Sequence, residues 1–105
     1  MVVIILERVS ARLRGELSRW MIEPHTGIFV GHINAMVRDR LWDKCCKESG
    51  NGGVVQLWSS NNEQRFQIRM WGDTKRRLKE YEGLQLIEIP IETKEGEEQG
   101  EKMRN

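Results

Sequence analysis

The sequence has little cysteine and histidine, and each shortage excludes a class of protein. Its two cysteines, Cys45 and Cys46, are adjacent, so we expect no structural disulfide, and there is no CxxC pair with metal-ligand spacing. The two histidines, His25 and His32, are isolated and predict no zinc site. We therefore expect an unremarkable thiol pair in a reducing compartment.

Long apolar runs are also missing. The opening run at residues 2–6 is far shorter than the ~20 apolar residues that a membrane span needs. No basic residues precede it and no small-residue cleavage site follows it, so we expect no signal peptide and place the protein in the cytoplasm. A chain of 105 residues, 38% hydrophobic and 31% charged, is typical of one globular domain.

A strong net charge is absent as well, but the average hides an asymmetry. Residues 92–105 hold five acids and three bases, so the 17 bases and 16 acids of the whole chain become 14 and 11 without them. The remainder carries a net charge of +3, and its bases are clustered. Clustering matters more than the total for binding a polyanion.

The first two dozen residues predict a central strand followed by a helix. Residues 2–9 read as a strand buried on both faces, and Ser10 is a suitable N-cap for the helix. We expect that helix to end before Pro24. Gly15 costs it about 1 kcal/mol relative to alanine, which indicates close approach of another helix or of a nucleic-acid backbone. One apolar stripe faces the sheet: Leu13, Leu17, Trp20 and Met21.

The rest of the chain predicts a second helix and four more strands. They are a short strand at 28–30, a helix capped by Asn34 that runs to about Lys47, strands at 54–58 and 65–71, and a last strand at 84–89. Alternation of apolar and polar residues marks the strand at 65–71. We expect residues 1–91 to form one domain and the charged residues 92–105 to be a flexible tail.

This order of elements predicts an α+β fold, a ferredoxin-like two-layer sandwich with two helices on one face of the sheet. The other face would be bare in a single chain. It would carry part of one of two apolar sets, Phe66, Ile68 and Met70 or Trp58 and Trp71. Because such a face usually marks an interface, we expect a homodimer, paired sheet against sheet or strand to strand.

Two groups of bases are candidates for binding nucleic acid. Arg12 and Arg14, with Arg8 just before them, lie where the first strand passes into the helix, and Lys75, Arg76 and Arg77 follow one another in a loop. Each group could be no more than solvated surface charge. Cations near a helix N-terminus are unfavourable unless an anion is present, however, and a phosphate would supply it. The loop lacks interleaved aromatics, which favours backbone contact over base stacking.

Five segments together resemble one protein family. They are VVIILERV with SARLRGELSRW, then GIFVGHIN, the hairpin VVQLWSSNNEQRFQIRMWG, and GLQLIEIP. The chain is similar, from about Val2 to Pro90, to CRISPR-associated protein 2 of the type I-E systems. The resemblance implies a ferredoxin-like homodimer that bridges dimers of the CRISPR-associated integrase, CRISPR-associated protein 1, and holds the double-stranded DNA of a protospacer.

The same resemblance implies which residues contact the DNA. The family's contacts fall on Arg12 and Arg14 of the RLRG motif, and on Lys75 and Arg76, with Arg77 as an added base. A further family lysine falls on Met36, so that contact is missing here, with Arg38 nearby as a substitute. In this family the C-terminal strand docks on the integrase, which implies a partner surface at 84–91.

Many members of the wider family carry an aspartate where this chain has Glu7. That aspartate is proposed to hold a divalent metal for phosphodiester cleavage, and two copies of Glu7 in a dimer could meet around one Mg²⁺. Structural ion pairing, with Arg8 adjacent, is the alternative for Glu7.

Three functions remain open at this stage. The first is a DNA-binding adaptor that needs no cofactor for binding and performs no chemistry. The second is a metal-dependent endonuclease of RNA or DNA that uses Glu7, and the third is a small-ligand or regulatory domain.

Overall fold

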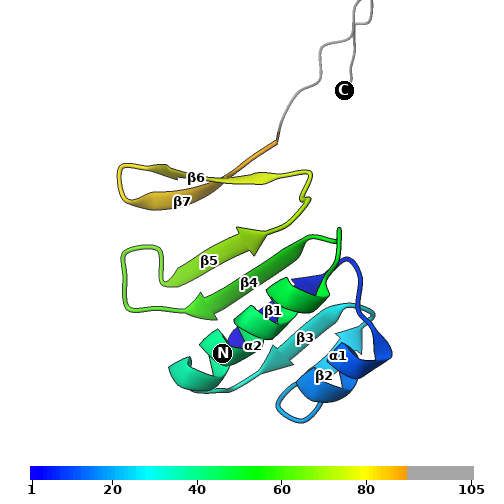
Figure 1. Ribbon diagram of the computed structural model, residues 1–105. Helices are drawn as coiled ribbons and strands as arrows, with labels where there is room; N and C mark the ends of the chain where they lie inside the picture. The colour runs from blue at the N-terminus through cyan, green and yellow to red at the C-terminus, as the bar shows by residue number, and fades with distance from the viewer. Residues whose placement is uncertain (90–105) are drawn as a thin grey trace, which may run out of the picture.

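The computed structural model describes residues 1–89, which form two helices and seven strands (Figure 1). In chain order these are β1 (Val2–Leu6), α1 (Ala11–Leu17), β2 (Ile22–His25), β3 (Ile28–Gly31), α2 (Ala35–Glu48), β4 (Val54–Ser59), β5 (Phe66–Trp71), β6 (Arg77–Tyr81) and β7 (Leu84–Glu88). The predicted tail lies outside the described residues.

Five strands form one antiparallel sheet in the order β2-β3-β1-β4-β5. Within the described residues both helices lie on the same side of it (Figure 1). The order of the first four strands, with a helix after β1 and another after β3, is the ferredoxin-like arrangement. The predicted α+β, ferredoxin-like fold is therefore confirmed, and β5 extends the sheet through a hairpin.

Both helices begin at the predicted caps. The Ser10 hydroxyl accepts from Leu13 N at 3.1 Å, and the Asn34 side chain accepts from Val37 N at 2.9 Å. These bonds satisfy amides that the first turn of a helix leaves free. The apolar side chains of the two helices then pack on β1 and β3 in a single core: Leu13, Leu17, Val37, Leu41 and Cys45 with Ile4 and Phe29.

The first two elements are shorter than predicted. β1 ends at Leu6 rather than at residue 9, because its last pair is Leu6 with Val54 and the chain bends at Glu7. α1 ends at Leu17, and the Ser18 amide caps it by donating to Arg14 O. Trp20 therefore leaves the helical stripe and is 45% exposed, contrary to its predicted place in the core.

The segment after α1 forms a strand that the sequence did not predict. β2 pairs with β3 at the edge of the sheet, even though it contains Pro24. An edge strand tolerates proline because its outward N–H needs no partner. The expected close neighbour of Gly15 is also absent: within the described residues, a Cβ added there would meet no atom within 4 Å.

The sheet face away from the helices is apolar across its width. Register decides which apolar set lies there, because Val54 and Gln56, which are buried under the helices, pair with Trp71 and Arg69. Trp58 and Trp71 therefore belong to the helix side. The opposite face, which we call the open face, carries Val3, Ile5, Ile28, Val30, Val55, Leu57, Phe66, Ile68 and Met70.

The last two strands form a separate hairpin. β6 was not predicted as a strand, and its first residue, Arg77, was predicted to be in a loop. It pairs with β7 through a two-residue turn in which Glu82 and Gly83 have positive φ angles of 50° and 81°, the geometry of a type I′ turn. Two glutamines tie this hairpin to the edge of β5. The Gln85 amide bonds to both N and O of Ile68 at 3.1 and 3.0 Å, and the Gln64 amide bonds to both N and O of Gln85.

Candidate nucleic-acid interface

Three chain connections meet at one end of the five-stranded sheet (Figure 1). Leu6 pairs with Val54, and Val54 pairs with Trp71, so β1 and β5 end where β4 begins. Glycines let these connections touch: a Cβ on Gly52 would lie 3.0 Å from Arg8 Cγ, and one on Gly53 would lie 2.7 Å from Thr74 Cγ2. Segments distant in sequence therefore bring their bases to one end of the molecule.

Arg12 lies in the first turn of α1 and is exposed. The first turn contains no acidic residue, and no ion pair within residues 1–89 involves Arg12. A cation in this place adds to the positive end of the helix dipole. Within the described residues, the Arg12 guanidinium is therefore available to an anion.

Arg14 is held by a carboxylate that the sequence reasoning missed. Its Nε donates to Glu23 Oε1 at 2.8 Å, and the other oxygen of Glu23 accepts from Gly27 N at 2.9 Å. The hydrogen bond from Arg14, followed by the bond from Gly27, lowers the pKa of Glu23. The stabilisation from this pair is present at neutral pH and is lost as the pH falls through the lowered pKa.

Lys75 and Arg76 are exposed in the loop between β5 and β6. They line a hollow of about 200 Å³ that also contains Glu7 and the open-face residues Ile5 and Met70. The pair therefore lies where the open face reaches the end of the sheet. One carboxylate faces two cations there, so the hollow has an excess of positive charge.

Glu7 does not fit a divalent metal in a single chain. Its Oε1 accepts from Gly53 N at 3.2 Å, and its hollow is shared with Lys75 and Arg76, which repel a cation. Within residues 1–89 no group of three histidine, cysteine, aspartate or glutamate side chains is placed to hold a metal ion. Mg²⁺ takes near-octahedral oxygen coordination, whereas among the described lining residues of this hollow Glu7 is the one carboxylate, and it already accepts a backbone hydrogen bond.

Arg77 separates from its two neighbours. It begins β6 and lines a different hollow, together with Arg69 and Trp71. Arg69 and Trp71 are on the helix side of the sheet, whereas the hollow of Lys75 and Arg76 opens on the other side. The three bases predicted as one patch therefore lie on two surfaces, Lys75 and Arg76 on one and Arg77 on the other.

Arg38 is not positioned to replace the lysine that the resemblance implies at Met36. Its guanidinium lies 4.3 Å from the ring centroid of Trp58, and its Nε pairs with Asp39 at 3.0 Å. Arg40 is near the position where the resemblance implies a lysine. Its Nη2 is 3.8 Å from the Met36 sulfur, and both side chains are exposed.

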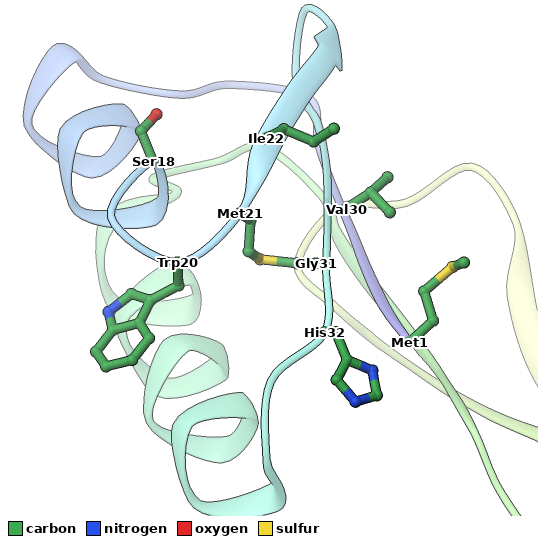
Figure 2. A pocket seen from close by; sticks show the side chains of 8 residues that line it. All are labelled: Met1, Ser18, Trp20, Met21, Ile22, Val30, Gly31 and His32. Carbon is green, nitrogen blue, oxygen red and sulfur yellow. The ribbon is translucent and has the colours of Figure 1, made fainter.

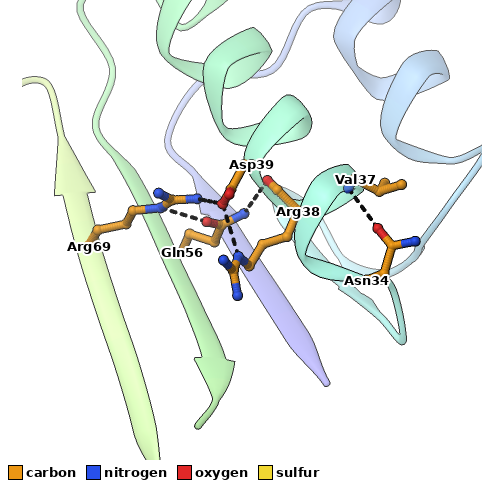
Figure 3. Close-up of polar contacts among 6 residues, drawn as sticks. All are labelled: Asn34, Val37, Arg38, Asp39, Gln56 and Arg69. Carbon is orange, nitrogen blue, oxygen red and sulfur yellow. Dashed lines mark hydrogen bonds and ion pairs between the residues drawn. The ribbon is translucent and has the colours of Figure 1, made fainter.

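A polar network joins α2 to β4 and β5 on the helix side of the sheet (Figure 3). Gln56, which is 0% exposed, donates to Arg38 O at 3.1 Å and accepts from Arg69 Nε at 2.8 Å. Arg69 also donates to Asp39 at 2.9 Å and stacks over the rings of Trp42 and Trp58. Asp39 accepts hydrogen bonds from Arg38 and Arg69. The bond from Arg38 has the larger effect, and both lower the pKa of Asp39 despite the opposing effect of partial burial. The network therefore fixes α2 to β4 and β5 on this side of the sheet.

The sequence of the chain was then compared with known families. The model of the CRISPR-associated protein family Cas_Cas2CT1978 matches residues 1–86. The chain belongs to this family. The match covers the five-stranded sheet, both helices and most of the last hairpin, and the family is consistent with a role in CRISPR adaptation.

Another hollow of this family member lies away from the clustered bases. It has a volume of about 550 Å³, and Figure 2 shows its lining, which includes Trp20, Ile22 and Val30. The hollow adjoins the start of β1 and the end of β3, at the opposite end of the sheet from Lys75. None of its described lining residues is a lysine or an arginine.

The two cysteines of this CRISPR-associated protein are both free, as predicted. Cys45 is buried in the core, and burial, followed by the neighbouring Cys46 and Glu48, raises its pKa to about 12. A thiol with so high a pKa is a weak nucleophile at neutral pH. Within the described residues, no helix is both long and apolar enough to cross a membrane.

Proposed function

We propose that this CRISPR-associated protein is a DNA-binding structural adaptor of spacer acquisition, of the type I-E class. Two copies pair through their open faces, bridge dimers of the integrase, CRISPR-associated protein 1, and hold the protospacer duplex by its phosphate backbone. The observation that carries the proposal is the gathering of Arg12, Lys75 and Arg76 at one end of the sheet. These bases come from segments more than sixty residues apart.

Phosphate binding explains this arrangement better than solvated surface charge does. Exposed bases of a protein are usually interspersed with acids, whereas residues 1–89 contain no ion pair to Arg12, Lys75 or Arg76. The exposed Gly15 adds to this, because it leaves α1 without a side chain on an open surface near Arg12. A duplex backbone can approach the helix closely there.

The open face supports the pairing of two copies. On the three strands at its centre its side chains are apolar except for Ser59 at the end of β4, and Ile5 there is 37% exposed. An apolar face of this breadth is unfavourable in water. Self-association would cover it and place two sets of bases on one particle.

The C-terminal hairpin supports a separate surface for the integrase. Leu86, Ile87 and Ile89 are exposed on or just after β7, within the partner segment at 84–91 that the family resemblance implies. Because glutamine side chains tie the hairpin to β5, these apolar groups project from the sheet rather than joining its core. Residues 90 and 91 of that segment lie outside the described residues.

The proposal is tested by measuring duplex binding across a salt titration. For the wild type we expect the logarithm of the affinity to fall linearly with the logarithm of salt, as it does when bases displace counterions from phosphates. The triple variant Arg12→Ala, Lys75→Ala, Arg76→Ala should lose at least about 100-fold in affinity and have a shallower slope by about five in a dimer. The control Arg19→Ala, which removes an exposed base at the far end of α1, should match the wild type.

Two outcomes would point to the other candidate functions. A wild-type protein with no salt-dependent duplex binding would refute the adaptor and favour a small-ligand or regulatory domain. Cleavage of DNA or RNA that disappears in a folded Glu7→Ala variant would favour the endonuclease. For an adaptor we expect Glu7→Ala to leave spacer capture intact.

The Arg14–Glu23 pair gives a second, more specific prediction. Glu23→Gln removes the carboxylate that now occupies Arg14, so the guanidinium becomes free for a phosphate. We expect duplex affinity to rise by about threefold to tenfold. Glu16→Gln is the matched control. It removes one negative charge as Glu23→Gln does, but it frees Lys44, the partner of Glu16, and leaves the Arg14–Glu23 pair intact.

An equal rise in both glutamine variants would show that overall charge, not Arg14, is responsible. A double variant, Glu23→Gln with Arg14→Ala, also distinguishes an effect of Arg14 from an effect of overall charge. If Arg14 contacts the backbone, adding Arg14→Ala should cancel the gain from Glu23→Gln. The measurement is the same salt titration with the same duplex.

A further inference from the structure

A second hollow on this protein has the chemistry of a nucleotide site. It has a volume of about 410 Å³ and lies between the end of β5 and the start of β6, within the size range of small-molecule sites. Two arginines, a tryptophan and a threonine supply its functional groups: Arg69, Arg77, Trp71 and Thr74. Two guanidinium groups beside an indole are suited to a ligand with both an anionic group and a planar ring.

Trp71 is an exposed aromatic surface that the fold does not use. It is 54% exposed and does not belong to the core cluster, although it pairs with the fully buried Val54. It lies at the end of β5, the outermost strand of the main sheet, beyond the strands that α1 and α2 cover. The exposed apolar surface of this indole is unfavourable in water, and a ring stacked on it would cover that surface.

Arg69 is a fixed cation at the wall of the hollow. Its Nε and Nη2 are bound to Gln56 and Asp39, and its planar group is stacked over Trp42 and Trp58 (Figure 3). Within residues 1–89 no hydrogen bond uses its Nη1 group. Asp39 is shared with Arg38, so one carboxylate balances two guanidinium groups and the network stays positive.

Arg77 adds a second cation to the lining of the hollow. It is exposed, and within the described residues it takes part in no ion pair. A phosphate between Arg69 and Arg77 would neutralise both, and guanidinium groups are well matched to phosphate oxygens. Thr74 lines both this hollow and that of Lys75 and Arg76, so the site is continuous with the proposed duplex surface.

The geometry points to a site for one unpaired nucleotide of the bound DNA, with its base on the indole of Trp71 and its phosphate between Arg69 and Arg77. This inference rests on the proposed function, since it assumes that a duplex occupies the adjoining surface. The nucleotide must be unpaired because the bases of a duplex are stacked on one another and cannot lie on a side chain. Base stacking on an aromatic side chain tolerates any base, so no sequence preference is expected.

The test compares a blunt duplex with the same duplex carrying short single-stranded tails, by fluorescence anisotropy at fixed salt. For the wild type we expect the tails to increase affinity by about tenfold, the size of one stacking contact. In Trp71→Leu this tail-dependent gain should disappear while blunt-duplex affinity stays unchanged. Trp71→Phe should keep most of the gain, and the exposed Arg77→Gln should reduce it by about threefold or more. Arg19→Gln is the matched control.

The possible failures are distinguishable. A wild type that binds both probes equally, or a Trp71→Leu variant that keeps the full gain, overturns the nucleotide site and leaves the proposed function intact. A wild type that binds neither probe in a salt-dependent way overturns both. If Trp71→Leu unfolds, as judged by its circular dichroism and thermal transition, then Arg77→Gln decides: an unchanged gain in that variant refutes the site.

Discussion

Replacing Ile5 with glutamate should convert a dimer of this protein into monomers. Ile5 lies on β1, the central strand of the sheet, and its side chain is on the open face, opposite Ile28 and Val55. Because it is 37% exposed in the single chain, a carboxylate there can remain hydrated and the monomer should fold. In a dimer paired through this face, the same carboxylate would lose its water among apolar side chains, and pairing with Lys75 or Arg76 of its hollow would offset only part of that cost.

The expected effect on pairing is large. Desolvation of a carboxylate costs several kcal/mol, and the two-fold relation introduces it twice, so the dimer dissociation constant should rise by at least ~1,000-fold. Sedimentation velocity over a range of protein concentrations measures this directly. Duplex affinity should fall as well, because a monomer presents half the contacts and loses the gain from linked binding.

Met36→Glu is the matched control for the change in oligomeric state. It makes the same apolar-to-acidic substitution at an exposed position of α2, on the helix side. We expect it to leave the dimer unchanged. If Ile5→Glu and the wild type sediment alike, pairing through the open face is wrong, whether both are monomers or both are dimers.

Replacing Arg69 with leucine should destabilise the fold by about 2–4 kcal/mol. The substitution leaves the fully buried Gln56 Oε1 without its donor, and an unsatisfied buried polar group costs about 1–3 kcal/mol. It also removes the guanidinium that stacks over Trp42 and Trp58, worth up to ~2 kcal/mol when partly desolvated. For a domain of this size the unfolding midpoint should fall by roughly 10–25 °C.

The double variant Gln56→Met with Arg69→Leu tests the cause. It removes the buried donor and acceptor together with the arginine, so less polar surface is left without a partner. We expect it to be more stable than Arg69→Leu alone, by about 1–2 kcal/mol. Arg40→Leu, which replaces an exposed arginine on α2, should change stability by less than about 0.5 kcal/mol. Equal losses in the single and double variants would show that stacking, not Gln56, accounts for the effect.

Features that depend on near neighbours in the chain were predicted correctly. Ser10 and Asn34 cap their helices because a cap needs only its own side chain and an amide three residues on. The four-residue spacing of Val37, Leu41 and Cys45 identified the buried side of α2. The β4–β5 hairpin followed from two predicted strands joined by a polar turn, the second of them marked by alternation of apolar and polar residues.

Edge strands were missed because their sequences carry no comparable pattern. β2 is Ile-Glu-Pro-His and β6 is Arg-Leu-Lys-Glu-Tyr, and neither buries an alternating apolar face. Both exist because the backbone of a neighbouring strand, β3 or β7, supplies hydrogen-bond partners. Pairing of this kind depends on what the rest of the fold places beside the segment.

The candidate site divides in the same way. The sequence by itself determined that Arg12, Arg14 and the run from Lys75 to Arg77 are clustered bases, because clustering along a chain is visible without a fold. Only the tertiary structure decided that Arg14 is occupied by Glu23, that Arg77 faces Arg69 and Trp71, and that Glu7 shares a hollow with cations. The physical reason is distance: these contacts join different elements, and the register of the sheet sets on which face each side chain lies.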